Sequence, residues 1–148
     1  MKKRIVAFVM AVLMLLSVSG TAFAVENGAI EITPFASKYL NSYTVVLAAK
    51  GSGKMVVSMS VDGTGIMDKI GVMEVEIDYL KNGTWYYWDS LDSVEHPEFY
   101  AYNSRDYVGD AYFTGTPGVT YYVTLTVYAK KGSGSDTGYV TSSAVVCK

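Results

Sequence analysis

Apolar and polar side chains alternate along most of the chain beyond residue 40. Separate runs with this two-residue period, divided by Gly-rich turns, cover residues 43–50, 55–62, 73–80, 107–114, 119–130 and 139–147. Such a period is typical of strands with one face on a core and the other face in water. No stretch after residue 24 has a helical period, so the pattern predicts an all-β domain of about seven antiparallel strands.

Asn82 and Gly83 predict a two-residue hairpin turn, because both residue types tolerate positive φ. A turn of this kind sets the register of the two strands that it joins. The predicted opposite pairs are Lys81 with Thr84, Leu80 with Trp85, Tyr79 with Tyr86, Asp78 with Tyr87 and Ile77 with Trp88.

Directly opposite residues share a face of the sheet, so this register sorts the aromatic side chains of the hairpin. Tyr86 and Trp88 are expected to join the core. Trp85 and Tyr87 are expected to point outward, on the same side as Asp78. Four consecutive aromatic residues therefore alternate between an inner and an outer role.

The N-terminal segment has the three parts of a secretory signal peptide. Lys2–Arg4 is basic, Ile5–Val18 is apolar apart from one serine, and Ala22 and Ala24 provide a small-residue cleavage motif. A membrane anchor is the alternative, but a spanning helix needs about 20 apolar residues. We therefore expect a signal helix that is cleaved after Ala24, and a secreted, extracellular product.

Beyond the signal peptide, 1–24, we expect an N-terminal extension, 25–38, and one β-sandwich domain, 39–148. Three of the 12 basic residues precede the cleavage point, which leaves 9 against 14 acidic residues. Nucleic acids and anionic membranes require clustered Lys and Arg, so neither is an expected partner of the mature form. Cys147 is the single cysteine, so no disulfide forms within the chain. It is a buried strand residue, a free thiol or an intermolecular link.

Two segments resemble a fibronectin type III or related immunoglobulin-like domain. Residues 117–125, PGVTYYVTL, resemble the proline-glycine turn, corner tyrosine and strand F of that family, and residues 70–77, IGVMEVEI, resemble strand C and its entry. The resemblance implies a seven-stranded antiparallel sandwich in which the hydroxyl of Tyr121 bonds to nearby backbone. Gly71 belongs to the second segment and is assigned a structural role. The turn residues Asn82 and Gly83 are assigned structural roles as well. The family's buried Trp is missing from the second strand, and Trp88 is expected to fill that space.

Residues 64–77, TGIMDKIGVMEVEI, followed by a Trp-containing hairpin, are also similar to small exported proteins of Gram-positive bacteria whose function is unassigned. This second likeness implies a bacterial origin and export. It implies no activity.

The outward face of the predicted sheet is the candidate binding surface. It carries three acidic and four aromatic residues: Glu74, Glu76, Asp78, Trp85, Tyr87, Tyr122 and Tyr128. Aromatic rings stack on sugar rings and carboxylates accept hydrogen bonds from hydroxyls, so the face suits a carbohydrate. The same rings suit a protein contact, because Trp and Tyr give a large contact area. A solvated face with stabilising cross-strand pairs, each contributing about 0.2–1 kcal/mol, is the third alternative.

Catalytic and metal-binding patterns are weak by comparison. Residues 89–100 break the two-residue period and are predicted to form an acidic connecting loop. This loop, which includes Asp92 and Glu95, lacks the ligand spacing of a calcium loop. His96 is the only histidine, and no nucleophile motif surrounds it. Glu74 and Glu76 lie on one strand face, whereas a glycosidase pair flanks its bond from opposite sides. We therefore expect no catalytic residue, metal ligand or cofactor.

The expected function is that of a secreted, non-catalytic module that works by surface recognition. Protein contact, including self-association, is the first hypothesis. Binding of a cell-surface carbohydrate or cell wall through the aromatic and acidic face is the second. A small hydrolase built around His96 is the third, and it would need a pocket there.

Overall fold

Strands account for most of the structure, as the sequence pattern predicts. The computed structural model describes residues 30–33 and 37–148. Within them lie β1 (Ile30–Ile32), β2 (Leu40–Gly51), β3 (Lys54–Lys81), β4 (Thr84–Asp92), the 3₁₀ turn η1 (Pro97–Phe99), β5 (Tyr100–Thr114), β6 (Thr120–Lys131), β7 (Gly134–Thr141) and β8 (Val145–Val146). The all-β prediction is confirmed.

The predicted signal peptide and its cleavage point after Ala24 lie outside the described residues. The same holds for residues 25–29 and 34–36 of the predicted N-terminal extension. Within the described part of that extension, Ile30–Ile32 forms β1 and pairs with β2, so these residues are a strand of the sheet. In the described part of the chain, no helix is long and apolar enough to cross a membrane.

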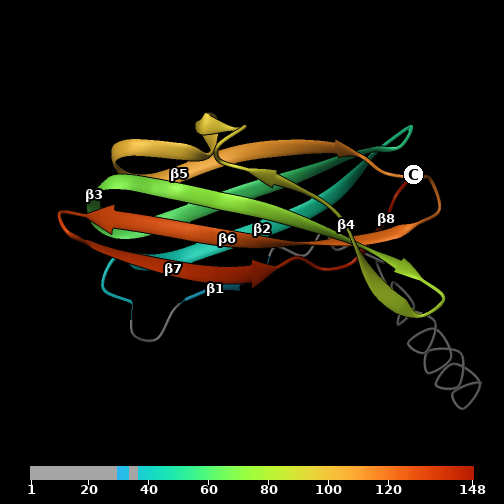
Figure 1. The fold of residues 1–148 in the computed structure, drawn as a ribbon, viewed down its shortest axis with the longest axis horizontal. Coiled ribbons are helices and arrows are strands. Elements are labelled where there is room, and N and C mark those ends of the chain that lie inside the picture. Colours follow the sequence, from blue (N-terminus) through green and yellow to red (C-terminus); the bar gives the residue numbers. More distant parts are fainter. Residues whose placement is uncertain (1–29, 34–36) are drawn as a thin grey trace, which may run out of the picture.

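The strands form one curled antiparallel sheet. Its main path is β1-β2-β3-β6-β7, while β4 and β5 pair with β3 and β8 pairs with β6. The first part of β3 lies between β2 and β5. The second part has β6 on one side, and the start of β5 followed by β4 on the other. β3 therefore belongs to both halves of the curl (Figure 1).

β3 is one strand of 28 residues, whereas residues 55–62 and 73–80 were predicted as two. The pairing of β3 with β5 shifts between Asp62 and Met67, so the residues between them form a bulge. A Cβ at Gly63 would approach the Arg105 carbonyl oxygen and the Met67 side chain to 3.0 Å, so the bulge is tightly packed. A bulge bends a strand without ending it, which explains why this glycine-containing segment continues as strand.

The predicted acidic loop at 89–100 is also shorter than expected, because β4 continues through Asp92 and β5 begins at Tyr100. The Asp92 carboxylate accepts hydrogen bonds from the backbone N–H groups of Val94 (2.8 Å) and Glu95 (3.0 Å). These bonds, above all the one from Glu95, lower the pKa of Asp92. The carboxylate therefore stabilises the turn.

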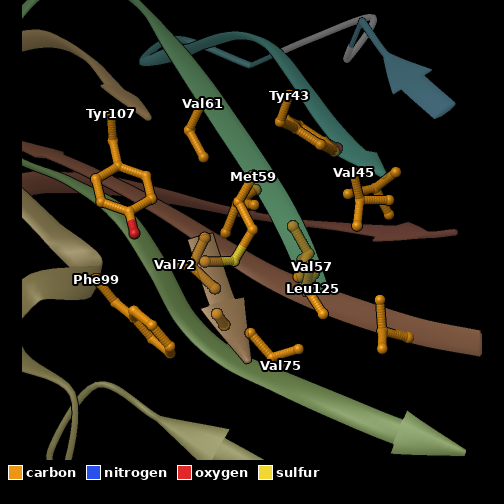
Figure 2. Close-up of a cluster of buried hydrophobic side chains, with 14 of the residues drawn as sticks. Tyr43, Val45, Val57, Met59, Val61, Val72, Val75, Phe99, Tyr107 and Leu125 are labelled. Carbon is orange, nitrogen blue, oxygen red and sulfur yellow. The ribbon is translucent and has the colours of Figure 1, made fainter. Parts of the chain in front are cut away.

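The hydrophobic core lies inside the curl, where alternate residues of facing strands meet. Figure 2 shows its central cluster, which includes Tyr43, Val45, Val57, Met59, Val61, Val72, Val75, Phe99, Tyr107 and Leu125. Full burial of one large aliphatic side chain contributes about 1.5–3 kcal/mol. The two-residue period of the sequence is therefore explained by one inner face that continues around the curl.

Tyr121 is fully buried at the start of β6. Its hydroxyl oxygen accepts a hydrogen bond from the backbone N–H of Thr116 at 2.9 Å, which ties the turn before β6 to the strand. This is the backbone contact that the fibronectin-like resemblance predicts for this tyrosine. A Cβ on Gly115 would lie 2.9 Å from the Tyr121 ring, so only glycine fits there without a shift.

Cys147 directly follows β8 and is a buried free thiol. Its backbone is held on both sides: its N–H donates to the Val119 carbonyl, and its carbonyl accepts from Gly118 N–H, both at 2.9 Å. An intermolecular link was one of the three predicted alternatives for Cys147. The buried thiol is not placed for such a link.

Asp136 in β7 holds the entry to β2. One of its carboxylate oxygens accepts hydrogen bonds from the Ser37 hydroxyl (2.6 Å) and from the backbone N–H groups of Lys38 and Tyr39 (both 2.7 Å). The Ser37 bond is the main reason that the pKa of Asp136 is lowered. This contact joins strands that are far apart along the main path of the sheet.

Gly71 lies where β3 passes between β5 and β6, opposite Tyr100 on one side and Tyr128 on the other. Its φ is +152°, and a Cβ at this position would overlap the carbonyl oxygen of Phe99. Only glycine combines this backbone conformation with such a close approach.

Gly71→Ala should therefore lower the free energy of unfolding by about 2–4 kcal/mol, as measured by urea denaturation. Gly65→Ala, in the bulge of the same strand, is the matched control, because a Cβ there has no atom within 4 Å. Equal losses in the two variants would contradict the crowding at Gly71.

Candidate functional site

The hairpin between β3 and β4 carries most of the predicted site residues. Asn82 and Gly83 have φ values of 53° and 77°, as a primed two-residue turn requires. The pairing follows the predicted register from Lys81 opposite Thr84 to Asp78 opposite Tyr87. Beyond that point the register shifts, and Ile77 pairs with Asp89.

The prediction that Trp88 pairs with Ile77 and joins the core is therefore wrong. Trp88 is the extra residue of a bulge, and its side chain is 44% exposed, while that of Tyr86 is 47% exposed. Both rings do lie on the predicted side: Tyr79 contacts Tyr86 and Trp88, with ring centroids 5.8 and 5.5 Å apart. They remain exposed because the hairpin projects from the body of the curl, at the lower right of Figure 1.

Trp85 and Tyr87 lie on the opposite, outward side of the hairpin, as predicted. Their side chains are 38% and 59% exposed. The Trp85 ring meets the half-buried Tyr122 ring of β6 edge to face, with centroids 4.5 Å apart. Tyr122 therefore supports Trp85 from beneath and leaves part of the indole in water.

Asp78 lies between Tyr87 and Tyr122 in register, on the same side. The expectation that it faces water is wrong, because it is only 8% exposed and one carboxylate oxygen has no hydrogen-bond partner. Burial raises the pKa of Asp78, and the neighbouring Tyr122 hydroxyl partly opposes this. The pKa of Tyr122 is also raised, first by burial and then by the Asp78 charge. The acidic group is thus built into the aromatic surface.

Glu74 and Glu76 continue the outward face along β3, opposite Thr126 and Thr124 of β6. Glu76 is exposed and Glu74 is half-buried. The hydroxyls of Thr124 and Thr141 are hydrogen-bonded to each other at 3.0 Å. This middle part of the face presents mainly oxygen atoms, with the exposed Tyr139 ring of β7 opposite Thr126.

Tyr128 shares the outward face but not the cluster around Trp85. It is six positions along β6 from Tyr122, which corresponds to about 20 Å of strand. Its ring instead meets Tyr100 of β5, with centroids 6.2 Å apart. The structure therefore brings together Trp85, Tyr87, Tyr122 and Asp78, and leaves Tyr128 in a second group.

The second group contains residues that the sequence reasoning missed. The ammonium nitrogen of Lys69 lies 3.6 Å from the Tyr100 ring centroid and 5.9 Å from that of Tyr102. Tyr102 and Tyr139 are both exposed on this side. The sequence offered one signal for this group, the alternation of Tyr100 and Tyr102 at the start of β5. It was missed because Tyr100 was predicted to lie in a loop.

His96 lies at the edge of a cavity of about 170 Å³ that is also lined by Leu91, Glu98, Phe99, Asp110, Ala111 and Tyr112. Its ring stacks on Phe99, and its Nδ1 is 2.9 Å from a Glu98 carboxylate oxygen. That contact lowers the pKa of Glu98. The lining contains no Ser, Thr or Cys to act as nucleophile. Among residues 30–33 and 37–148, no three His, Cys, Asp or Glu side chains are grouped to hold a metal ion.

Comparison of the chain with protein-family models, curated proteins and solved structures finds no match. The function is therefore inferred from the surface chemistry of this molecule. The aromatic hairpin is the largest concentration of exposed rings described above, so it is the candidate site.

The raised pKa of Asp78 has a consequence for stability. The folded protein binds this proton more tightly than the unfolded chain does, so ionisation of Asp78 destabilises the folded state. This destabilisation is absent below the unfolded pKa, near 4. It grows as pH rises above the unfolded pKa, and it is complete once the carboxyl group is ionised in the folded protein. Asp78→Asn should therefore stabilise the protein at pH 7, by on the order of 1 kcal/mol, and the gain should vanish near pH 3.

Urea denaturation at a series of pH values measures this difference. Glu76→Gln, on the same face of the same strand but exposed, is the control and should have no such effect. A pH-independent difference for Asp78→Asn would show that the carboxyl group is not the cause.

Proposed function

We propose that this protein is an exported, non-catalytic recognition module that binds another protein through β4. The observation that carries the proposal is the combination of a free strand edge with four consecutive exposed aromatic residues. The finer assignment of the curled sheet to the immunoglobulin-like and fibronectin type III-like sandwiches is part of this proposal. It is supported by the hydrogen bond of Tyr121 and by the resemblance of residues 70–77 and 117–125.

Export to the outside of a bacterial cell is the second part of the proposal. It is supported by the basic, apolar and small-residue parts of 1–24. It also fits the likeness of residues 64–77 to small exported proteins. A module that acts outside the cell meets proteins and glycans of the cell surface.

The free edge supports a protein partner. In the described part of the chain, β4 pairs with β3 alone, so its other edge offers unpaired backbone groups to an added strand. β5 also has an edge without a partner strand, but that strand carries Arg105, Asp106 and Asp110. Charged residues protect an edge from pairing. Residues 84–88 of β4 have no charge.

The aromatic residues supply the contact energy. Trp and Tyr dominate the residues whose loss weakens protein interfaces most, because they bury a large area with few rotatable bonds. On β4 two rings face each side of the sheet, so a strand added at the edge meets rings above and below. Exposed patches of this kind mark interaction sites more often than isolated apolar residues do.

The first test uses a photo-crosslinking amino acid, p-benzoylphenylalanine, in place of Tyr87 in the producing cells. Illumination should give covalent adducts with protein, identified by mass spectrometry. The same group in place of Tyr112 is the control, since Tyr112 is 65% exposed on β5. We expect at least about tenfold more adduct from position 87. Absence of protein adducts at position 87 would remove the proposal.

Carbohydrate binding by the outward face is the second candidate function. It is favoured by the alternation of rings and oxygen atoms along that face, with Trp85 and Tyr87 at one end, Glu76 in the middle and Tyr139 beside it. Sugars present apolar ring faces and hydroxyl groups in a similar alternation. This candidate shares Trp85 with the first one but does not use the strand edge.

Trp85→Ala and Tyr122→Ala should each weaken retention on a polysaccharide or peptidoglycan column by about tenfold or more. The melting temperature should fall by only a few degrees, because the contact between the two rings is lost but neither residue belongs to the buried core. Tyr112→Ala serves as the control for loss of an exposed ring. Unaltered retention in both test variants would end the carbohydrate hypothesis.

A further inference from the structure

We infer that the strand added to β4 is β4 of a second copy of this chain, in an antiparallel pair related by a two-fold axis. This inference rests on the proposed protein contact and names its partner. Three features carry it: the direction of the free backbone groups, the symmetry of the aromatic pattern, and the charges that border it.

The hairpin geometry determines which backbone groups of β4 are free. Lys81 and Thr84 flank a two-residue turn, so they form a hydrogen-bonded pair, and opposite pairs alternate along an antiparallel ladder. The N–H and C=O groups of Thr84 and Tyr86 therefore point to β3. Those of Trp85 and Tyr87 point to the free edge. A partner strand has two residues to bond, before the bulge at Trp88.

A second β4 matches these two residues when the axis passes through Tyr86. Trp85 of each copy then lies opposite Tyr87 of the other, and both pairs exchange backbone hydrogen bonds. A two-fold axis perpendicular to the sheet keeps each face continuous, so the outward rings of the two copies meet on one side. On the other side Tyr86 lies opposite its own counterpart, in the closer, non-hydrogen-bonded kind of pair.

Other symmetric registers fit less well. An axis through Trp85 places Tyr87 opposite Gly83, which is part of the turn. An axis through Tyr87 places Trp85 opposite Asp89, beyond the bulge. Only the register centred on Tyr86 pairs every ring with another ring or with the methyl-bearing Thr84, and aromatic pairs contribute about 0.5–1.5 kcal/mol each beyond their burial.

The charges around the aromatic stretch are complementary in this register. Asp89 of one copy, beyond the bulge, then lies near Gly83 of the other, two residues from the exposed Lys81. Among the described residues Lys81 forms no ion pair within the chain. The two-fold axis creates this contact twice, once at each end of the paired strands.

The size of the contact predicts a weak dimer. A buried aromatic residue covers about 150–250 Å², and about half of that is free on each of the four rings, so they supply roughly 300–500 Å² per copy. Stable interfaces bury about 800 Å² per partner. The pair is therefore expected to form and dissociate with concentration.

Substitution of Tyr86 tests the register, because this residue faces its own counterpart. Tyr86→Lys and Tyr86→Glu should each place two like charges in direct opposition and raise the dimer dissociation constant at least about tenfold. An equimolar mixture of the two variants should recover association as a heterodimer. Tyr112→Lys is the matched control and should associate like the unchanged protein. Sedimentation velocity over a concentration series measures these four samples and the unchanged protein.

Recovery in the mixture also shows that both variants are folded. A protein that is monomeric up to about 1 mM, or a mixture that stays monomeric while the unchanged protein dimerises, would overturn the inference. If either of these results is obtained but position 87 forms adducts with a different protein, the proposed protein contact stands without self-association. If position 87 gives no protein adduct either, both fail.

Discussion

The continuous backbone ladder along β3 is the constraint on which the rest of the structure depends. Because its first part pairs with β2 and β5 and its second part with β6, β5 and β4, one strand aligns the inner faces of both halves of the curl. The bulge between Asp62 and Met67 bends the ladder, and the close approach of Phe99 to Gly71 holds the bend against the neighbouring strand. The core and the projecting hairpin are both positioned by this one element.

The same constraint produces the exposed edge. β5 occupies the side of β3 only as far as Gly71, and β4 continues that side from Glu74 to Lys81. No described strand covers the outer edge of β4. The hairpin is therefore held by β3 and β6 on one side, and its four aromatic side chains stay partly exposed.

Much of the fold follows from local patterns in the sequence, because the two-residue period and the Asn82-Gly83 turn act over a few residues. The turn correctly predicted four pairs of opposite residues, from Lys81 with Thr84 to Asp78 with Tyr87. It did not predict the extra residue at Trp88, since a bulge depends on the twist of the strands and has no composition of its own. The burial of Asp78 was missed for a similar reason: it depends on Tyr122, a residue 44 positions away in sequence, lying beside it in the sheet.

The buried thiol of Cys147 gives the molecule an internal chemical reporter. A reagent in the solvent reaches this sulfur only when the last segment detaches from the turn before β6, because Val119 and Gly118 hold the backbone of Cys147 on both sides. The rate of thiol modification therefore measures how often this end of the sheet opens under native conditions. The same opening rate limits how fast an oxidant in the solvent reaches the thiol of this single cysteine.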